Sequence, residues 1–593
     1  MGLLQRALET YEANIDRVGL YQDGENEPLA PVAHRAGESG ILITLTQRGQ
    51  FLSAEKNIEV ILFPVTENSI NRTSTGAIKN PHPLCDKLSY LGTEFYIDEL
   101  DRWANSAYTH DTVKCVLAYM RQGTLMEDLA RYGIGKTTAD LGAIVRWYIS
   151  GLPVGQEGAC WKDRTLFNAF TGYYMTQITS NERNFCMVSG EEGCSISEKH
   201  PGLIFGNTKL ISTNEAGAIV FSGRFSRVKE ACTVSYTASQ KAHNAIRWLI
   251  ANQGNSYGKK RRGIKREDCV FLCWNPQGEE ILDPEGSFPG LDFGAIIEPS
   301  DYKERLNSTL LSFKKERQLD GTETAVTASF EAATTGRVAV TYYSELTVDD
   351  LLDRMKAWDE YCCWTGSRKY HGVQTPNLLR MVDFAFGTLQ GKNFETASKT
   401  VRQQIQRLVI CKMNRGWIPE EIKNLLMQKA NHMELYGDDK DWDYLRSRLL
   451  FVTCAVIRKY RHDYKKEEWE MALDPNKKDI SYQYGRLLAV LEKAERDTYD
   501  DDEKREPNAV RMQLTYVKRP QHTAQAVWGQ VRTAYMPNLA PKTRNFYHKL
   551  LGQIMEQISQ FSEEEQTKSL GDTYMLGYYL QRNDLYTKKD QKD

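Results

Sequence analysis

The sequence predicts an α+β fold for the N-terminal and middle regions, with irregular and mostly antiparallel sheets, and an all-α helical bundle for the C-terminal region. Apolar runs typical of strands occur only up to about residue 345. Beyond residue 376 the apolar residues follow helical spacing instead. The chain has 593 residues, more than one hydrophobic core usually serves, so we expect several domains that pack on one another.

The N-terminal region begins with a predicted helix and continues with strands. Leu4, Leu8 and Tyr11 repeat at helical spacing. A loop containing Gly and Pro follows, and then come the strand-like runs 41–46 and 58–65. Because an amphipathic helix must bury its apolar face, we expect it to dock on the sheet of these strands.

The middle region alternates between strand and helix patterns. Strand-like runs occupy residues 217–222, 268–274 and 337–343, and helical spacing covers 242–251. This irregular order is typical of an α+β region rather than of repeated βαβ units.

The C-terminal region loses its strand signals beyond Pro376. Amphipathic periodicity replaces them, as in Leu445, Leu449, Val452 and Val456. We therefore predict three regions. They are an N-terminal α+β domain of residues 1–110, a middle α+β region of 111–375 and a C-terminal helical bundle of 376–593.

The composition limits the kind of partner this chain can have. The chain has 76 Lys and Arg residues and 78 Asp and Glu residues. A protein with this balance does not bind nucleic acid over its whole surface, so any contact with nucleic acid must be local. The strongest local concentration of positive charge consists of Lys259, Lys260, Arg261, Arg262, Lys265 and Arg266. No apolar run is long enough to span a membrane and no signal peptide is evident, so we expect a cytoplasmic protein with reduced cysteines.

Two motifs could indicate a ligand, and each has a simpler interpretation. The run Gly133, Ile134, Gly135, Lys136, Thr137 resembles the end of a phosphate-binding loop. It follows a helical pattern rather than a strand, which favours a helix C-cap. Cysteines and a histidine that could form a zinc site are Cys160, Cys186, Cys194 and His200. No close cysteine pair occurs among them, so buried thiols are favoured and no metal or cofactor is expected.

No catalytic constellation is apparent in the sequence. The ten histidines form none of the spacings that hold a hydrolytic metal. We therefore expect a protein that is not an enzyme. The alternative is a metal-dependent nuclease whose ligands come from separate segments.

The segment 68–86 carries side chains suited to nucleic acid. Guanidinium, hydroxyl, amide and ammonium groups lie on a loop punctuated by Gly and Pro, and these groups can grip phosphates and base edges. The residues concerned are Asn71, Arg72, Thr73, Ser74, Lys79 and Asn80. An ordinary polar surface loop is the competing interpretation.

Motifs that resemble one family are spread over nearly the whole chain in family order. In the first half they are Arg72, Thr73, Ser74, Leu84, Cys85, Asp86, Lys87, Tyr90, Cys186, Met187, Val188, Ser189, Gly190, Glu191, His200, Pro201, Ser235, Tyr236, Gln240 and Asn244. In the second half they are Arg337, Val338, Ala339, Val340, Met471, Ala472, Leu473, Asp474, Tyr482, Gln483, Tyr484, Gly485, Arg486, Leu487, Gly577, Tyr578, Tyr579, Gln581 and Arg582. Together they resemble the large subunit of the type I-C CRISPR surveillance complex, Cascade.

This resemblance implies crRNA-guided binding of double-stranded DNA in antiviral defence. Pairing with the guide reads the target, while the large subunit reads a short protospacer-adjacent motif and stabilises the R-loop, as in another effector type. The loop of residues 71–80 would contact that motif, and the basic run 259–266 would hold the non-target strand or adjacent duplex. The implied partners are the backbone and crRNA-end subunits, the crRNA, and a helicase-nuclease that cuts.

The resemblance also implies a separately made small subunit. In this family a protein similar to the C-terminal helical part arises by internal translation, and Met471 is a candidate start. Its product would comprise residues 471–593. The competing interpretation is that Met471 is only a core residue.

Overall fold

The computed structural model divides the chain into two compact units. The first contains Met1–Ile281 and Thr324–Leu346, and the second Leu282–Glu323 and Thr347–Asp593. The structure describes residues 1–70, 72, 78–179, 183–197, 199–202, 208–211, 232–257, 269–277, 281, 301–334, 336–366, 372–391, 393–436, 442–500, 503 and 505–587. Within these ranges, no helix combines the length and the apolarity that crossing a membrane requires.

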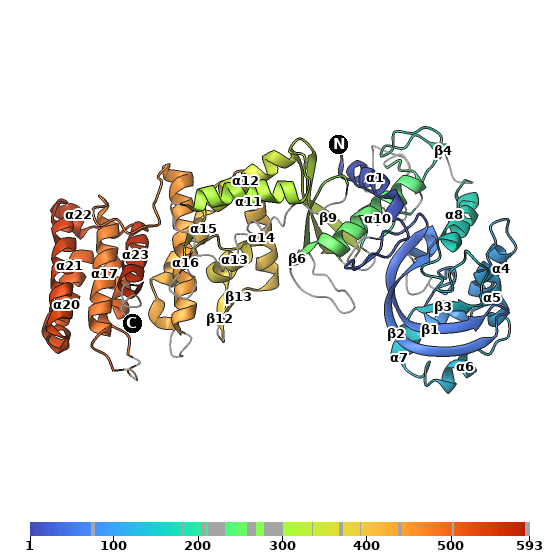
Figure 1. The fold of residues 1–593 in the computed structure, drawn as a ribbon, viewed down its shortest axis with the longest axis horizontal. Helices are drawn as coiled ribbons and strands as arrows, with labels where there is room; N and C mark the ends of the chain where they lie inside the picture. Colours follow the sequence, from blue (N-terminus) through green and yellow to red (C-terminus); the bar gives the residue numbers. More distant parts are fainter. Residues whose placement is uncertain are drawn as a thin grey trace, which may run out of the picture. The chain divides into compact units, whose positions relative to one another are not determined.

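A three-stranded sheet forms one half of the first unit. Strands β1 (His34–Thr46) and β2 (Phe51–Pro64) make a long antiparallel hairpin, and β3 (Val145–Ser150) pairs with β1 in parallel (Figure 1). The hairpin turns at Gly49, whose φ of +71° favours glycine. The predicted strands 41–46 and 58–65 are therefore confirmed.

Short helices connect and cover this sheet, and their apolar faces form the first core. Before β3 they are α2 (Glu67–Ile70), α3 (Leu88–Leu91), α4 (Glu94–Ala104), α5 (Asp111–Met120), α6 (Leu125–Arg131) and α7 (Thr138–Gly142), and after it comes α8 (Arg164–Ile178). Helix α6 ends at Arg131, and Gly133 follows its C-cap Tyr132 with a φ of +69°. Thr137 then caps α7, so the motif at 133–137 is a helix C-cap followed by an N-cap, as predicted.

A second sheet lies in the same unit. Its strands follow the order β6-β7-β8-β9, and the pairs β6/β7 and β7/β8 are antiparallel. The strands are β6 (Asn255–Tyr257), β7 (Cys269–Trp274), β8 (Thr324–Thr334) and β9 (Arg337–Thr347). The strand predictions at 268–274 and 337–343 are confirmed, whereas 217–222 lies outside the described residues.

Helices α1 (Leu3–Ala13) and α10 (Tyr236–Gln253) share one hydrophobic core with this second sheet. The helix predicted at 242–251 is thus confirmed within α10. The prediction that the first helix docks on the strands 41–46 and 58–65 is wrong. Small Ala7 fits against α10, and the Trp274 indole of β7 donates a hydrogen bond to Thr10 at 3.1 Å, so α1 belongs to the second sheet.

The second unit is mainly helical, as predicted for the C-terminal region. Its helices are α11 (Tyr302–Glu316), α12 (Val348–Tyr361), α13 (Leu378–Phe386), α14 (Ser398–Met413), α15 (Glu420–Ala430), α16 (Trp442–Tyr460), α17 (Ile480–Arg496), α18 (Asn508–Arg511), α19 (Gln513–Lys518), α20 (Pro520–Gln530), α21 (Pro541–Ser559), α22 (Glu563–Thr567) and α23 (Thr573–Thr587). The expectation that strands vanish beyond Pro376 is wrong in one place. Strands β12 (Thr388–Gln390) and β13 (Asn393–Glu395) form a hairpin too short to show an alternating pattern.

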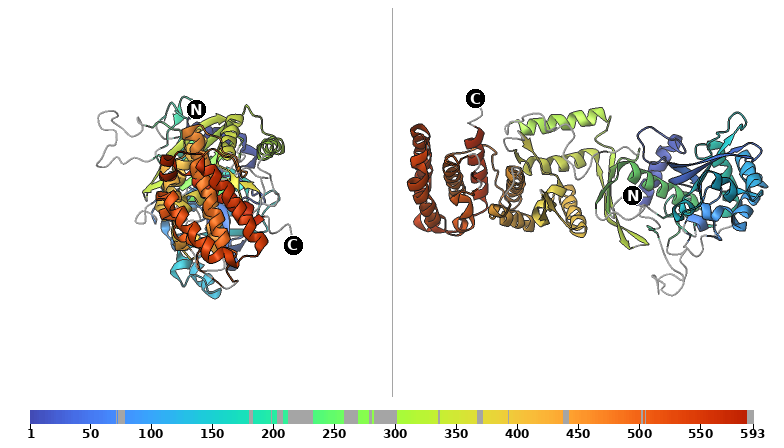
Figure 2. Two further views of the ribbon diagram at one scale, coloured as in Figure 1. Left: turned by 90° about the vertical axis from the view of Figure 1, so that its left-hand side faces the viewer. Right: turned by 90° about the horizontal axis from the view of Figure 1, so that it is seen from below.

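Helices α17, α20, α21 and α23 run side by side in the last part of this unit (Figures 1 and 2). Helices α17 and α23 approach most closely where glycines face the neighbouring backbone. A methyl group at Gly485 would collide with the carbonyl of Tyr574, and one at Gly577 with the carbonyl of Tyr482. These two glycines therefore allow close helix packing.

Candidate nucleic-acid interface

A buried ion pair stands at the base of the predicted DNA-contacting loop. The Arg72 guanidinium donates to both carboxylate oxygens of Asp86, with one N–O distance of 2.6 Å. It also donates to the backbone carbonyl of Asn80 at 3.0 Å. The Arg72 side chain is only 10% exposed and that of Asp86 is fully buried. Arg72, at the start of the loop, is thus bonded to Asn80 and Asp86 at its end.

Asp86 connects this ion pair to the sheet. Its carboxylate accepts the backbone N–H groups of His82 and Lys87, both at 2.7 Å. Its own backbone carbonyl accepts the N–H of Val145, the first residue of β3, at 2.8 Å. A buried carboxylate needs this number of donors to offset its desolvation. The base of the loop is therefore fixed to the core.

Aromatic and imidazole groups complete the surroundings of Arg72. The Tyr90 ring lies against the guanidinium, with 5.0 Å between the ring centre and the guanidinium carbon. Burial, together with the nearby Arg72 charge, holds the pKa of His82 well below its usual range. His82 is therefore neutral at physiological pH, and its Nδ1 lies 2.9 Å from the Ser69 hydroxyl.

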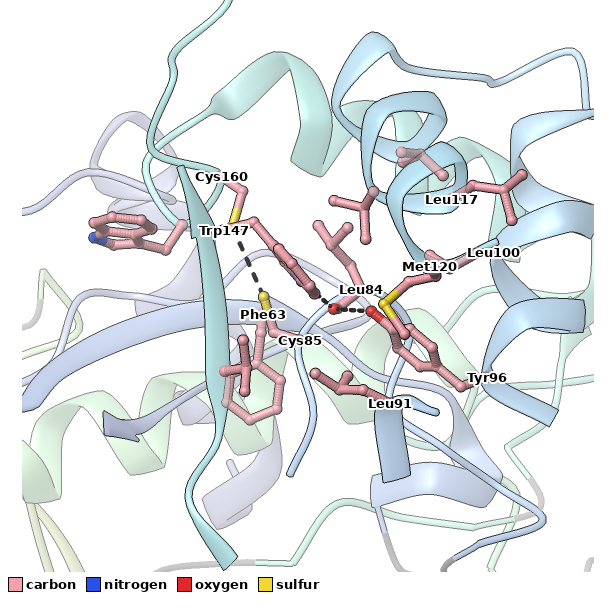
Figure 3. Packing of buried hydrophobic residues seen from close by; sticks show 14 of the residues in the cluster. Phe63, Leu84, Cys85, Leu91, Tyr96, Leu100, Leu117, Met120, Trp147 and Cys160 are labelled. Atoms are coloured by element: carbon pink, nitrogen blue, oxygen red, sulfur yellow. Dashed lines mark hydrogen bonds between the residues drawn. The ribbon is translucent and has the colours of Figure 1, made fainter. Parts of the chain in front are cut away.

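The turn before Asp86 is held by a single carbonyl group. Leu84 adopts the left-handed region with a φ of +68°. Its carbonyl oxygen accepts hydrogen bonds from the Trp147 indole at 2.8 Å and the Tyr96 hydroxyl at 2.5 Å (Figure 3). Cys85 is buried beside them, with its sulfur 3.7 Å from that of Cys160. These contacts offset the cost of the strained turn and fix the direction of the chain that leads to the loop.

Lys79 differs from Arg72 in its exposure and in its lack of an ion-pair partner among the described residues. It is exposed, and no carboxylate of the described residues lies within ion-pair distance of its ammonium group. Its neighbour Ile78 is also exposed, as is Lys87 at the other end of the segment. The structure therefore separates the two predicted donors. Arg72 is engaged within the protein, while Lys79 is available to a ligand.

The remaining predicted contact residues can be placed only in part. Asn80 is half-buried, and its carbonyl accepts from Arg72. Three loop residues and the whole basic run lie outside the described part of the chain: Asn71, Thr73, Ser74, Lys259, Lys260, Arg261, Arg262, Lys265 and Arg266.

The four candidate zinc ligands have other partners. Cys160 lies against Cys85, and the Cys194 thiol against the carbonyl of Glu191. Cys186 accepts backbone N–H groups from Ser189 and Ser235, and the His200 Nδ1 lies 2.8 Å from the Ser239 hydroxyl. In the described ranges, no three Cys, His, Asp or Glu residues come together as a metal site.

A model of one protein family matches almost the entire chain. The family is described as CRISPR-associated protein (Cas_Csd1), and the match covers residues 9–586. This chain belongs to the Cas_Csd1 family. No curated protein matches it.

Membership in Cas_Csd1 confirms the resemblance at the level of a CRISPR-associated protein. The matched range includes residues of both compact units, so it is not limited to a single domain. The match agrees with a large subunit of a Cascade-type complex.

Asp86 is the residue of this candidate site to which the sequence patterns assigned no role. It stands 14 residues after Arg72. This separation is too long for a contact within one turn or one helix to predict the pair. The one signal in the sequence was a lone Asp between Cys85 and Lys87 in an apolar stretch, since a buried acid normally requires a cationic partner.

Proposed function

We propose that this chain is the large subunit of a type I-C crRNA-guided surveillance complex. In this role it recognises the protospacer-adjacent motif, aids duplex opening, stabilises the R-loop and recruits a helicase-nuclease. The observation that carries the proposal is the family match over residues 9–586. The complex would act in the cytoplasm, and this chain would break no bond itself.

Within this function, Lys79 is the proposed DNA contact among the described loop residues. Its ammonium group can donate to a phosphate or to a base acceptor. Arg72 would act through the loop, because its guanidinium is already satisfied by Asp86 and Asn80. Asn71, Thr73 and Ser74 would supply further polar contacts.

A direct experiment compares reconstituted complexes with and without this chain on duplexes that carry or lack the flanking motif. Lys79→Ala should weaken binding of the correct duplex by about 1 to 3 kcal/mol while leaving assembly intact. Undiminished target affinity in the complex that lacks the chain would overturn the proposal.

The basic run 259–266 is the proposed contact for the non-target strand or adjacent duplex. Several phosphate contacts supply affinity that does not depend on sequence. Replacing Lys259, Lys260, Arg261 and Arg262 by Ala should lower affinity on all sequences and flatten its dependence on salt. An unchanged salt slope would argue against this role.

The nuclease alternative has a simple test. The purified chain is incubated with DNA and Mg²⁺ or Mn²⁺. Cleavage that persists through purification and disappears on a single Asp or Glu substitution would establish an enzyme and overturn the proposed non-catalytic role.

We further propose that Met471 starts a separate small subunit. Met471 lies between α16 and α17, so a product that begins there would contain α17 and every later helix intact. Replacing Met471 with Leu in the expressed gene should remove a product of residues 471–593. If the unaltered gene never yields that product, this part of the proposal fails.

A further inference from the structure

An exposed tryptophan marks a second surface, in the helical unit. Trp417 is 54% exposed and lies in the connection between α14 and α15. A single exposed apolar side chain is common on a protein surface, so the case for a binding site depends on what surrounds Trp417. Neither the proposed flanking-motif site nor the basic run 259–266 includes it.

Trp417 is the outermost member of a contiguous aromatic group. Its ring packs edge-on against Tyr464, with 4.6 Å between ring centres. Tyr464 in turn stacks on Tyr460 at 4.6 Å, with the two planes 25° apart. Trp417 is thus the exposed end of the group, Tyr464 is half-buried and Tyr460 is buried.

Cations surround this aromatic group. The Lys466 ammonium lies 5.4 Å from the centre of the Trp417 ring. Arg415 and Lys465 are exposed, and within the described ranges neither has a carboxylate at ion-pair distance. Nearby acids are already paired, since Glu420 contacts Lys423 and Glu421 contacts Arg407. The Glu420 carboxylate also accepts a hydrogen bond from the Tyr460 hydroxyl at 2.9 Å, so this acid lies at the aromatic group itself, where the charges of Lys423 and Lys465 act on it.

The aromatic and cationic groups are held by a buried carboxylate. Asp463 is 4% exposed and accepts the backbone N–H of Ile418, next to Trp417, at 2.9 Å. Its other oxygen accepts from Lys459 at 2.5 Å, and its backbone carbonyl accepts from Lys466 at 2.9 Å. One residue thus fixes both the Trp417 loop and the end of α16.

The backbone on both sides of the surface is irregular. Arg461–Lys465 form a π-helical turn. Arg415 and Lys466 have φ values of +53° and +58°, which residues other than glycine rarely adopt. Such turns and left-handed residues concentrate at functional sites, because a fold retains their cost where they place a side chain usefully.

We propose that this surface binds single-stranded nucleic acid, with Trp417 and Tyr464 as a stacking platform and Arg415, Lys465 and Lys466 as phosphate contacts. An aromatic platform with surrounding cations is the usual means of holding unpaired bases without reading their sequence. In a duplex the base faces are covered by neighbouring bases except at the two ends, so a stacking surface favours a single strand. The proposal rests on the proposed function, because the displaced DNA strand and the guide RNA are the two sources of such a ligand.

The first test measures binding by the full-length chain. Fluorescence anisotropy would follow a labelled single-stranded DNA, an RNA of the same sequence and the matching DNA duplex. Trp417→Ala should weaken single-strand binding by about tenfold, as expected when one stacked base loses its platform. Trp417→Phe should retain most of the affinity. Phe546→Ala removes another exposed aromatic residue of the same unit and should change nothing.

The cations are tested through salt. Replacing Arg415 and Lys465 by Ala should lower the slope of log affinity against log salt by about 0.7 for each phosphate that the variant no longer neutralises. Thermal melting should be unchanged in these variants, because the replaced side chains are exposed.

The assembled complex distinguishes the two sources. If the displaced strand is the ligand, Trp417→Ala increases the permanganate reactivity of its thymines while crRNA loading stays normal. If the guide is the ligand, the same variant loads crRNA poorly.

The proposal fails if the unaltered chain binds neither single strand, or if Trp417→Ala binds both as the unaltered chain does. It also fails if the variant instead loses a protein subunit at unchanged single-strand affinity, since the surface is then a protein interface. The proposed function would survive each of these results, provided that target binding still requires the chain.

Discussion

At the scale of single residues, Arg72 and Lys79 should respond differently to substitution. Arg72→Ala leaves the fully buried Asp86 without its cation, so we expect a loss of about 2 to 4 kcal/mol in the free energy of unfolding. Lys79→Ala removes an exposed side chain and should change stability by less than about 0.5 kcal/mol. Chemical denaturation of the purified chain measures both effects.

A double variant provides the control. Replacing Arg72 by Leu and Asp86 by Asn together removes the unpaired charge and keeps an oxygen that can accept a backbone N–H, so stability should recover in part relative to Arg72→Ala. DNA binding should not recover, if the ion pair sets the loop geometry. If Arg72→Ala is as stable as the unaltered chain and loses DNA binding as Lys79→Ala does, then Arg72 contacts DNA directly.

The polar and cationic residues of this loop could be named from the sequence, but which of them is paired within the protein could not. Arg72 and Lys79 both follow from composition, since a cation on a polar loop is a candidate for phosphate contact. Which cation is engaged depends on Asp86, and its position beneath Arg72 follows from the long-range pairing of Asp86 with Val145. Trp417 likewise has no local signal, because exposure is decided by the tertiary fold.

At the scale of elements, the α17–α23 contact depends on two glycines. Gly485→Ala or Gly577→Ala would place a methyl group against the backbone of the neighbouring helix. The helices must then separate, and we expect a loss of about 2 to 4 kcal/mol in the free energy of unfolding. Gly552→Ala in α21 is the matched control, because its methyl group would meet nothing within 4 Å.

Thermal unfolding of the three glycine variants measures the effect. Gly552→Ala should be neutral or stabilising by up to about 1 kcal/mol, since alanine is the better helix former. Equal destabilisation by all three substitutions would show that the loss does not arise from the α17–α23 contact.

Helices and strands with clear apolar periodicity could be predicted from the sequence, but the elements that they pair with or pack against could not. The strands of β1, β2, β7 and β9 and the helix α10 appear where apolar periodicity places them. The parallel pairing of β3 with β1 and the docking of α1 on the second sheet were not predicted. Both join segments far apart in sequence, and period alone does not identify a partner.

At the scale of the whole molecule, each compact unit contains a carboxylate whose pKa is strongly lowered. In the second unit, burial opposes ionisation of Glu492, but Arg582, Arg446, Arg496 and the Tyr578 hydroxyl lower its pKa to about 2. In the first unit, Glu345 also has a pKa of about 2.

For Glu345 burial again opposes ionisation. Hydrogen bonds from Tyr343 and Arg6 overcome this effect. The Arg6 Nη2 lies 2.8 Å from the carboxylate and the Tyr343 hydroxyl 2.5 Å. Glu345 and Glu492 share no partner among the described residues, so the two units should respond to acid through separate groups.

Glu345 and Glu492 should therefore each contribute to destabilisation by acid, and their two contributions should add. Because each folded-state pKa lies below the ordinary value of 4.5, the stabilisation is complete above about pH 5 and is lost as the pH falls from about 4.5 towards 2. Glu492→Gln and Glu345→Gln should each lower stability at pH 7 and flatten its decline in this window, and the double variant should show the sum of both effects.

Glu556→Gln replaces an exposed carboxylate and serves as the control in circular dichroism measured against pH. A double variant no less stable at pH 7 than either single one would show that the two contributions do not add, and so that the two groups are not independent.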